Sequence, residues 1–436
     1  MISRSDHSNE PNFLRHIFPS HRVPRASFAE DGIPISVPQA VSCLDSTLAL
    51  GALALQRPTI EQVIAFAELL ERLENRSGLL RRLEVLVDPT SGRDQLAALL
   101  EHRQARDLQL QPVALLPHPT AELIASLKGL ELREAGLMVA ASDFHRDSLD
   151  RTTQGLIRTI EACLALRIQP RLDMTDATRA DVEGFLLPVV DTCMEHLARL
   201  GAGQLRLRLC DTLGLGIPWS EAPVPRSVPR VLRLVGHTLG LQPAQLEFVG
   251  SNDLGLALAN TISASLHGCG TLVCSVGGVG ERSGIAPLEQ ALIHLSGLFG
   301  ADCDLTAVTE LLALLSRQLG LKPGRHHPLW GEAGLTTCLI PSGLPLEETL
   351  ELYAPFDTAR LIGRMPEIEV RPESGTAGIA HLLRQHLPGP ALEPDDAAII
   401  DLLAWIAAQG LTGPLSWEVV EPGVRELWPG RFEVED

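Results

Sequence analysis

Hydrophobic residues follow two alternating patterns along the chain. Short apolar runs, typical of buried strands, alternate with stretches whose apolar residues recur at three- and four-residue spacing, which is typical of amphipathic helices. The strand-like runs are 41–46, 83–88, 110–116, 136–142, 168–174, 205–210, 246–250 and 271–276. The helical stretches are 59–74, 92–105, 120–130, 150–166, 181–200, 228–240, 252–268 and one that begins at 288.

Eight strand-then-helix repeats predict an α/β fold, a TIM (β/α)8 barrel. A doubly wound open sheet is the competing architecture. It is disfavoured because no dinucleotide-type G-x-G-x-x-G follows the first strand.

The strand rhythm ends near residue 300. A helical stretch at 305–320 leads into a connector rich in Pro and Gly at 322–334, and helical patterns at 376–387 and 395–410 close the chain. The first 40 residues are punctuated by Pro and charges without a period, which predicts a loosely packed arm. We therefore expect three parts: an N-terminal arm (1–40), the barrel (41–300) and a mostly helical C-terminal appendage (301–436).

Composition excludes several classes of function. The formal charge of −18 argues against a nucleic-acid surface. No apolar run has the length of a membrane span, and the N-terminus lacks the apolar core of a signal peptide. The eight cysteines are scattered singly, which is typical of free thiols in a reducing compartment. We expect a cytoplasmic protein that binds neither nucleic acid nor membrane.

Two motifs in order point to a family. The run N-D-x-G-x-A-x-A-N spans 252–260, and G-x-G-E-R-x-G spans 278–284. They strongly resemble the last two βα units of the homocitrate synthase and 2-isopropylmalate synthase family, which are metal-dependent TIM barrels related to HMG-CoA lyase. The resemblance extends over roughly 41–385. It implies condensation of acetyl-CoA with a 2-oxo acid, and dimers in which one chain's appendage covers the other's barrel.

The positions that this resemblance assigns to catalysis carry unsuitable residues. The D-T-T-x-R-D-G segment matches at Asp45, Thr47 and Gly51, but the Arg is replaced by Ala49. Where the family holds its metal, through an Asp, the H-x-H before N-D and the Asn after G-E-R-x-G, the chain has Leu50, Val249, Ser251 and Ile285. Aliphatic side chains cannot bind a divalent ion. We expect no metal and no cofactor.

Further family positions have also changed. Thr175 replaces the acidic residue of an E-D-A-T-R segment, and Ile340 replaces a histidine of the appendage. The remaining candidates for a ligand pocket include a remnant anion or CoA site in the eighth loop. Each of them has a structural alternative, such as helix capping by the Asn252–Asp253 pair or ion pairing between Glu281 and Arg282. The pocket candidates are His145, Thr212, Asn252, Asp253, Glu281, Arg282 and Tyr353.

Two hypotheses of function follow. The first is a pseudoenzyme: a barrel that has lost metal-dependent condensation and acts as a binding, regulatory or structural subunit. It would form a homodimer or a heteromer with an active paralogue, with a small acid or CoA-type compound as a possible ligand. The second is a diverged acyltransferase or lyase that acts on a thioester or 2-oxo acid without metal, using Asp143, His145, Asp176 and Asp211 as acid–base groups.

Overall fold

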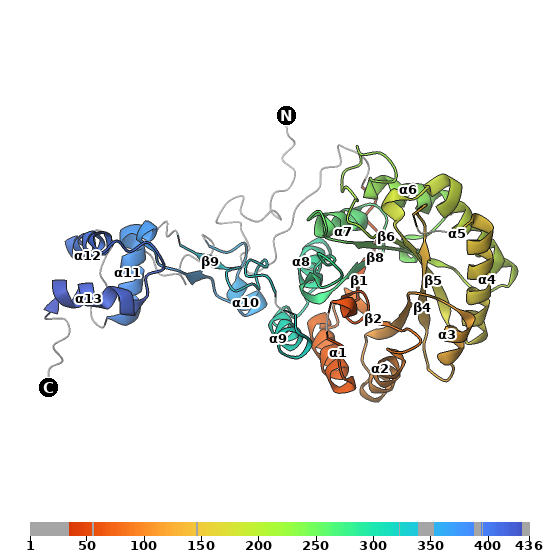
Figure 1. Ribbon diagram of the computed structural model, residues 1–436, viewed down its shortest axis with the longest axis horizontal. Coiled ribbons are helices and arrows are strands. Elements are labelled where there is room, and N and C mark those ends of the chain that lie inside the picture. The colour runs from red at the N-terminus through yellow and green to blue at the C-terminus, as the bar shows by residue number, and fades with distance from the viewer. Residues whose placement is uncertain are drawn as a thin grey trace. The chain divides into compact units, whose positions relative to one another are not determined.

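The N-terminal part of the chain folds into a closed barrel. The computed structural model describes residues 35–54, 56–144, 147–321, 323–338, 353–387, 394 and 396–429. Eight parallel strands pair in chain order, and β8 returns to β1 to close the ring, with helices outside it (Figure 1). The expected TIM barrel is therefore confirmed. The expected arm lies outside the described residues except for its last few positions.

All eight expected strands are present, although β2 begins three residues before the predicted run. The strands are β1 (Ser42–Asp45), β2 (Leu80–Leu86), β3 (Gln111–Leu116), β4 (Glu134–Ala140), β5 (Gln169–Thr175), β6 (Arg206–Asp211), β7 (Leu246–Gly250) and β8 (Thr271–Cys274). The helices of this unit are α1 (Ile60–Glu74), α2 (Arg93–Arg106), α3 (Ala121–Ser126), α4 (Leu149–Ala165), α5 (Leu187–Arg199), α6 (Val228–Thr238), α7 (Ala257–Leu266), α8 (Leu288–Phe299) and α9 (Ala307–Leu319).

Local sequence signals fix several helix ends. Thr59 and Gln62 form a reciprocal capping box at the start of α1, and Thr120 accepts a hydrogen bond from the backbone of Leu123 at the start of α3. The expected helix from residue 252 begins later, at Ala257. The residues before it form the loop at the end of β7, so the predicted start was wrong.

The structure divides near residue 322 into two compact units. Helix α9 belongs to the barrel unit because it packs against α1, where Arg72 pairs with Glu310 at 2.8 Å. The sequence pattern had placed the boundary at residue 300, before this helix.

The second unit is small and mostly helical. It contains β9 (Thr336–Thr337), β10 (Glu367–Ile368), α10 (Thr358–Ile362), α11 (Gly375–His386), α12 (Ala397–Ala408) and α13 (Trp417–Leu427). Its core is formed by side chains such as Ile379, Leu402 and Val420, one from each of the last three helices. Helix α13 was missed by the sequence analysis, which had the chain close with the preceding helix. Within the described residues, every helix is too short or too polar to cross a bilayer.

Candidate functional site

A pocket opens at the carboxyl ends of the barrel strands, the end at which TIM barrels carry their active sites. Its volume is about 410 Å³, within the range of small-molecule sites. We call it the mouth pocket. Its described lining residues are Ala49, Leu50, Leu53, Leu86, Asp88, Leu115, Pro117, His118, Met138, Thr175, Cys210, Asp211, Thr212, Val249, Ser251, Glu281, Arg282 and Ile285.

The positions that the family resemblance assigns to the metal lie together in this pocket. Leu50, Val249, Ser251 and Ile285 all line it, and so does Ala49, at the position of the expected arginine. Ser251 and Ile285 also pair through a backbone bridge. The four side chains offer one hydroxyl group and no carboxylate or imidazole. Within the described part of the chain, no three His, Cys, Asp or Glu side chains gather in a way that could hold a metal ion.

Three of these residues belong to a continuous apolar cluster, which we call the apolar floor. Partly buried Leu50 packs against this cluster, which contains Val249 and Ile285 and also includes residues from strands on other sides of the barrel. Burial of each such side chain contributes roughly 1.5–3 kcal/mol to the stability of the fold. Packed aliphatic side chains therefore stand where the family resemblance expects metal ligands. The apolar floor consists of Leu44, Val113, Cys210, Val249, Val273 and Ile285, with Leu50 against it.

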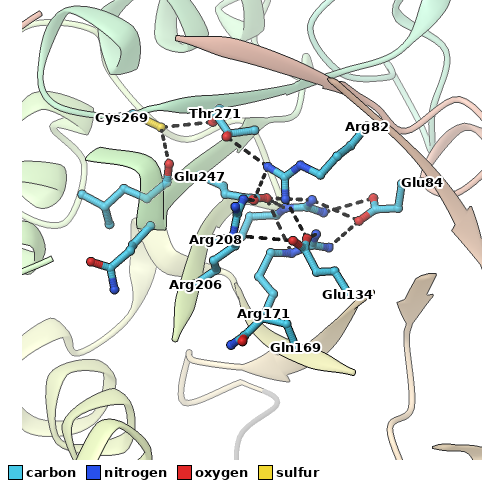
Figure 2. Close-up of polar contacts among 12 residues, drawn as sticks. Arg82, Glu84, Glu134, Gln169, Arg171, Arg206, Arg208, Glu247, Cys269 and Thr271 are labelled. Carbon is cyan, nitrogen blue, oxygen red and sulfur yellow. Dashed lines mark hydrogen bonds and ion pairs between the residues drawn. The ribbon is translucent and has the colours of Figure 1, made fainter. Parts of the chain in front are cut away.

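Deeper in the barrel lies a group of opposed charges, which we call the charged layer. Its side chains point toward one another from five strands (Figure 2). Arg171 contacts Glu134 at 2.6 Å and Asp173 at 2.7 Å, and it also pairs with Glu84. Arg208 contacts Glu247 at 2.9 Å. The charged layer consists of Arg82, Glu84, Glu134, Arg171, Asp173, Arg206, Arg208 and Glu247.

The charged layer is internally compensated. It holds four arginines and four carboxylates, so the formal charges cancel. Burial alone would raise the pKa of Glu84, but Arg208 and Arg171 outweigh it and hold that pKa below its usual value. For Asp173 burial prevails over the same two arginines and raises the pKa. The layer is a paired structural element, because its charges are satisfied by one another.

Arg282 organises the rim of the mouth pocket. Its Nε and Nη2 atoms contact the two carboxylate oxygens of Asp253 at 2.7 and 3.1 Å, and Nη2 also donates to the backbone oxygen of Thr212. Glu281 lies farther away, at 3.4 Å from Nη1. The expected pairing of Arg282 with Glu281 is therefore secondary to the one with Asp253. The hydrogen bond from Arg282 lowers the pKa of Asp253.

The asparagine of the first motif has a structural position. Its side-chain oxygen accepts a hydrogen bond from the backbone nitrogen of Ala257 at 3.4 Å, at the first residue of α7. The backbone nitrogen of Asn252 donates to the oxygen of Gly284 at 2.8 Å. Asn252 therefore ties the loop after β7 to the loop after β8.

Two of the carboxylates considered as acid–base groups already accept hydrogen bonds from other parts of the protein. Asp211 accepts hydrogen bonds from Thr178 at 2.6 Å and from the backbone of Leu215 and Gly216. Burial raises the pKa of Asp211, against the opposing effect of these bonds. Asp176 accepts from Ser142 and pairs with Arg179, each at 2.7 Å. Thr212 accepts a hydrogen bond from the backbone nitrogen of Asp176 at 2.8 Å.

The other predicted residues are distributed as follows. Thr175 ends β5 and lines the mouth pocket, where its hydroxyl donates to the backbone oxygen of Val139. Tyr353 is half-buried in the second unit, close before α10. His145 and Ile340 lie outside the described residues.

Two polar residues of the mouth pocket were missed by the sequence analysis. Asp88 follows β2, and its carboxylate accepts hydrogen bonds from Thr90 and Ser91, which lower its pKa to about 2. His118 follows β3 and exposes its imidazole at the pocket. Their signal was their place immediately after a strand, because that is where barrel strands present functional side chains.

Fold and site together define a TIM-barrel protein whose pocket lies at the carboxyl ends of the strands. The HMGL-like family model matches residues 40–314, and this chain belongs to that family. It is 31% identical to 2-phosphinomethylmalate synthase of Streptomyces hygroscopicus, over 96% of this chain and 97% of the relative.

A further relative and a solved structure are also similar to this chain. The chain is 28% identical to a citrate (Re)-synthase of Syntrophus aciditrophicus, over 97% of this chain and 69% of the relative. An HMG-CoA lyase structure from Acenitobacter baumannii, in complex with coenzyme A and 3-methylmalate, aligns with a TM-score of 0.51 at 20% identity. That alignment covers 70% of this chain and 98% of the lyase chain, and it supports the fold.

Proposed function

We propose that this chain binds a small molecule with an apolar body in the mouth pocket and no longer carries out metal-dependent condensation of acetyl-CoA with a 2-oxo acid. The observation that carries the proposal is the gathering of Leu50, Val249, Ser251 and Ile285 in one pocket. It is these positions that the family resemblance assigns to the metal. The proposed protein is a binding or regulatory subunit on an enzyme scaffold.

The chemistry of the site supports the loss of condensation. Magnesium, manganese and zinc require several oxygen or nitrogen ligands, and Ser251 alone supplies one weak donor. An enolate that forms from a thioester also needs a cation or hydrogen-bond donors, and Ala49 has no side-chain donor. Arg282 does not replace it, because its guanidinium is held by Asp253. No step of the condensation can therefore be assigned to these side chains.

A metal-free enzyme is the second candidate, and His118 is the observation that favours it. This exposed residue carries an imidazole and lines the pocket. It could serve as a general base toward a thioester or 2-oxo acid. Asp176 and Asp211 fit that role less well because their carboxylates are already hydrogen-bonded.

An assay of condensation tests the proposal. Purified protein is incubated with acetyl-CoA and a panel of 2-oxo acids, with magnesium, manganese or zinc, and free thiol is measured. We expect no release above the protein-free background. Metal-dependent turnover would overturn the proposal. Turnover without metal that is lost in His118→Ala would establish the second candidate.

Binding is tested separately from turnover. Thermal unfolding in the presence of 2-oxo acids, 2-hydroxy acids and CoA should reveal stabilisation by at least one of these compounds. The pocket-filling variant Ser251→Phe should abolish that stabilisation, whereas Ser220→Phe, whose side chain lies outside the mouth pocket, should keep it. We also propose assembly as a homodimer or with an active paralogue, which native mass spectrometry of the purified protein would detect.

A further inference from the structure

A second, larger cavity opens at the opposite end of the barrel from the mouth pocket. Its volume is about 950 Å³, and residues at the starts of strands line it, among them Ser42 of β1, Glu134 of β4 and Thr271 of β8. We call it the basal cavity. The N-terminal end of a TIM barrel ordinarily serves stability, so a cavity of this size there is open to another role.

Arginine dominates the basal cavity. Its described lining contains two glutamates, Glu74 and Glu134, and six arginines: Arg76, Arg81, Arg82, Arg103, Arg133 and Arg206. This excess of positive charge occurs in a chain whose formal net charge is −18. A local field of opposite sign to the whole molecule concentrates counter-ions in the cavity.

The roof of the cavity is rigid and already neutral. Arg82 is buried and contacts Glu134 at 2.6 Å, Glu247 at 2.6 Å and the hydroxyl of Thr271 at 3.0 Å (Figure 2). Arg206 also faces Glu134, at 3.5 Å. Both arginines belong to the charged layer, where four guanidinium groups balance four carboxylates. They therefore contribute fixed geometry and no net charge.

The other four arginines are only partly compensated. Among the described residues none of them forms an ion pair: the side chains of Arg81 and Arg103 donate only to the backbone oxygens of Gly78 and Leu110, each at 3.0 Å, and the side chains of Arg76 and Arg133 have no polar contact. Glu74 also lines the cavity and offsets one of these formal charges, although its carboxylate accepts hydrogen bonds from the backbone of Gly78 and the hydroxyl of Ser77. The balance is three formal positive charges around one cavity.

We propose that the basal cavity binds a small polyanion that carries several phosphate or carboxylate groups. A guanidinium presents a planar fork of donors that matches the paired oxygens of these groups. Several such forks around one cavity select for a ligand with several anionic groups. The site is separate from the mouth pocket, because the apolar floor and the charged layer lie between them.

Isothermal titration with tripolyphosphate and with citrate tests this proposal and separates the two anion classes. The test variant is Arg76→Gln with Arg133→Gln, which removes two arginines without a structural partner. The matched control is Arg158→Gln, an exposed arginine of α4 outside the cavity. A second control, Arg282→Gln, alters the rim of the mouth pocket. Thermal unfolding checks that each variant is folded.

We expect one equivalent of at least one anion to bind the unaltered protein, more weakly as salt is added. The double variant should lose at least about tenfold in affinity, and both controls should retain it. Tighter binding of tripolyphosphate would identify a polyphosphate site, and tighter binding of citrate a polycarboxylate site. No binding of either anion, or equal losses in Arg158→Gln and the double variant, would overturn the proposal.

Discussion

Gly136 of β4 faces Arg171 of β5 directly across the sheet, as register partners. A methyl group on Gly136 would lie 2.2 Å from Nη2 of Arg171 and 2.9 Å from a carboxylate oxygen of Asp173. The guanidinium cannot retreat, because Glu84 and Glu134 hold it from other strands. Because Gly136 has no side chain, it leaves room for the guanidinium of Arg171, the most buried arginine of the charged layer.

Gly136→Ala should therefore destabilise the barrel. The added methyl group either strains the sheet or displaces Arg171 from its carboxylates, and overpacking of this kind costs about 1–3 kcal/mol. Urea unfolding should show a lower midpoint. Gly155→Ala is the matched control, because a methyl group there meets nothing within 4 Å and lies inside α4. That control should gain about 0.5–1 kcal/mol. Equal stability of the two variants would show that Gly136 is not a packing position.

The buried carboxylate of Asp45 should make the folded protein less stable as the pH rises from acid to neutral. Its carboxylate is fully buried at the end of β1, where it accepts hydrogen bonds from the hydroxyl and backbone nitrogen of Thr47. Burial is the main cause that raises its pKa from 3.8 to about 7, and Glu289 and Glu84 add to it. Between these values the folded state keeps a proton that the unfolded state has released. Stability therefore falls as pH rises from about 4 to about 7.

Asp45→Asn removes this titration while it keeps the shape of the side chain. Relative to the unaltered protein, the variant should gain stability between pH 4 and pH 8, by up to about 4 kcal/mol if the full pKa difference is realised. Urea unfolding at both pH values measures the change. Asp88→Asn is a control of opposite sign, because the pKa of Asp88 is lowered to about 2. Its deficit should stay constant between pH 4 and pH 8 and shrink as pH falls from about 4 to about 2. A pH-independent effect of Asp45→Asn would contradict the prediction.

The rim pair of Arg282 and Asp253 should contribute little to stability. The side chains are 38% and 22% exposed, so solvent screens their attraction and the contribution is about 0.2–1 kcal/mol. Arg282→Gln should show a loss of this size in thermal unfolding. Because Arg282 lowers the pKa of Asp253, the loss should disappear in acid, where Asp253 is protonated in both proteins. It should also diminish with added salt. A loss of several kcal/mol would mean that the loops depend on this pair.

The barrel was predictable because its signal is local and repeated. Each strand is a run of apolar residues that precedes an amphipathic helix, and eight such units allow few other architectures. The charged layer was not predictable in the same way. Arg206 and Arg208 alternate with leucines in β6, as they would in a strand with one solvated face. Their buried position becomes evident only when Glu84, 124 residues away from Arg208, lies opposite.

The missed helix α13 has a comparable explanation. Pro422 and Gly423 interrupt its sequence and ordinarily indicate a turn. In the structure the glycine leaves room for the ring of Trp405, because a methyl group there would lie 2.5 Å from the ring. Tertiary packing thus overrides local propensity at this position.

The candidate site was partly predictable. Motif spacing placed Val249, Ser251 and Ile285 at one end of the barrel, and the structure brings them into one pocket. Asp88 and His118 belong to no motif that the sequence displays. Their role in the lining depends on how far each loop extends over the mouth, which the hydrophobic pattern does not encode.

Replacing Leu50, Val249, Ser251 and Ile285 with metal-binding side chains tests whether these four positions form the ancestral metal site. The quadruple variant Leu50→Asp, Val249→His, Ser251→His and Ile285→Asn places a carboxylate, two imidazoles and an amide where the family resemblance expects metal ligands. Without metal it should be less stable than the unaltered protein, because polar groups replace the apolar floor at a cost of about 1–3 kcal/mol each. Manganese or zinc should recover part of that stability, because a metal that binds only the folded state stabilises it.

Thermal unfolding with and without each metal measures this gain, and titration calorimetry gives the affinity. A matched control keeps Leu50→Asp and Ile285→Asn but moves the imidazoles to Leu115→His and Met138→His, which line the same pocket from β3 and β4. It carries the same ligand types in another arrangement, so a gain confined to the first variant reflects geometry. Equal gains in both would indicate adventitious binding, and no gain in either would show that the four positions do not form the ancestral metal site.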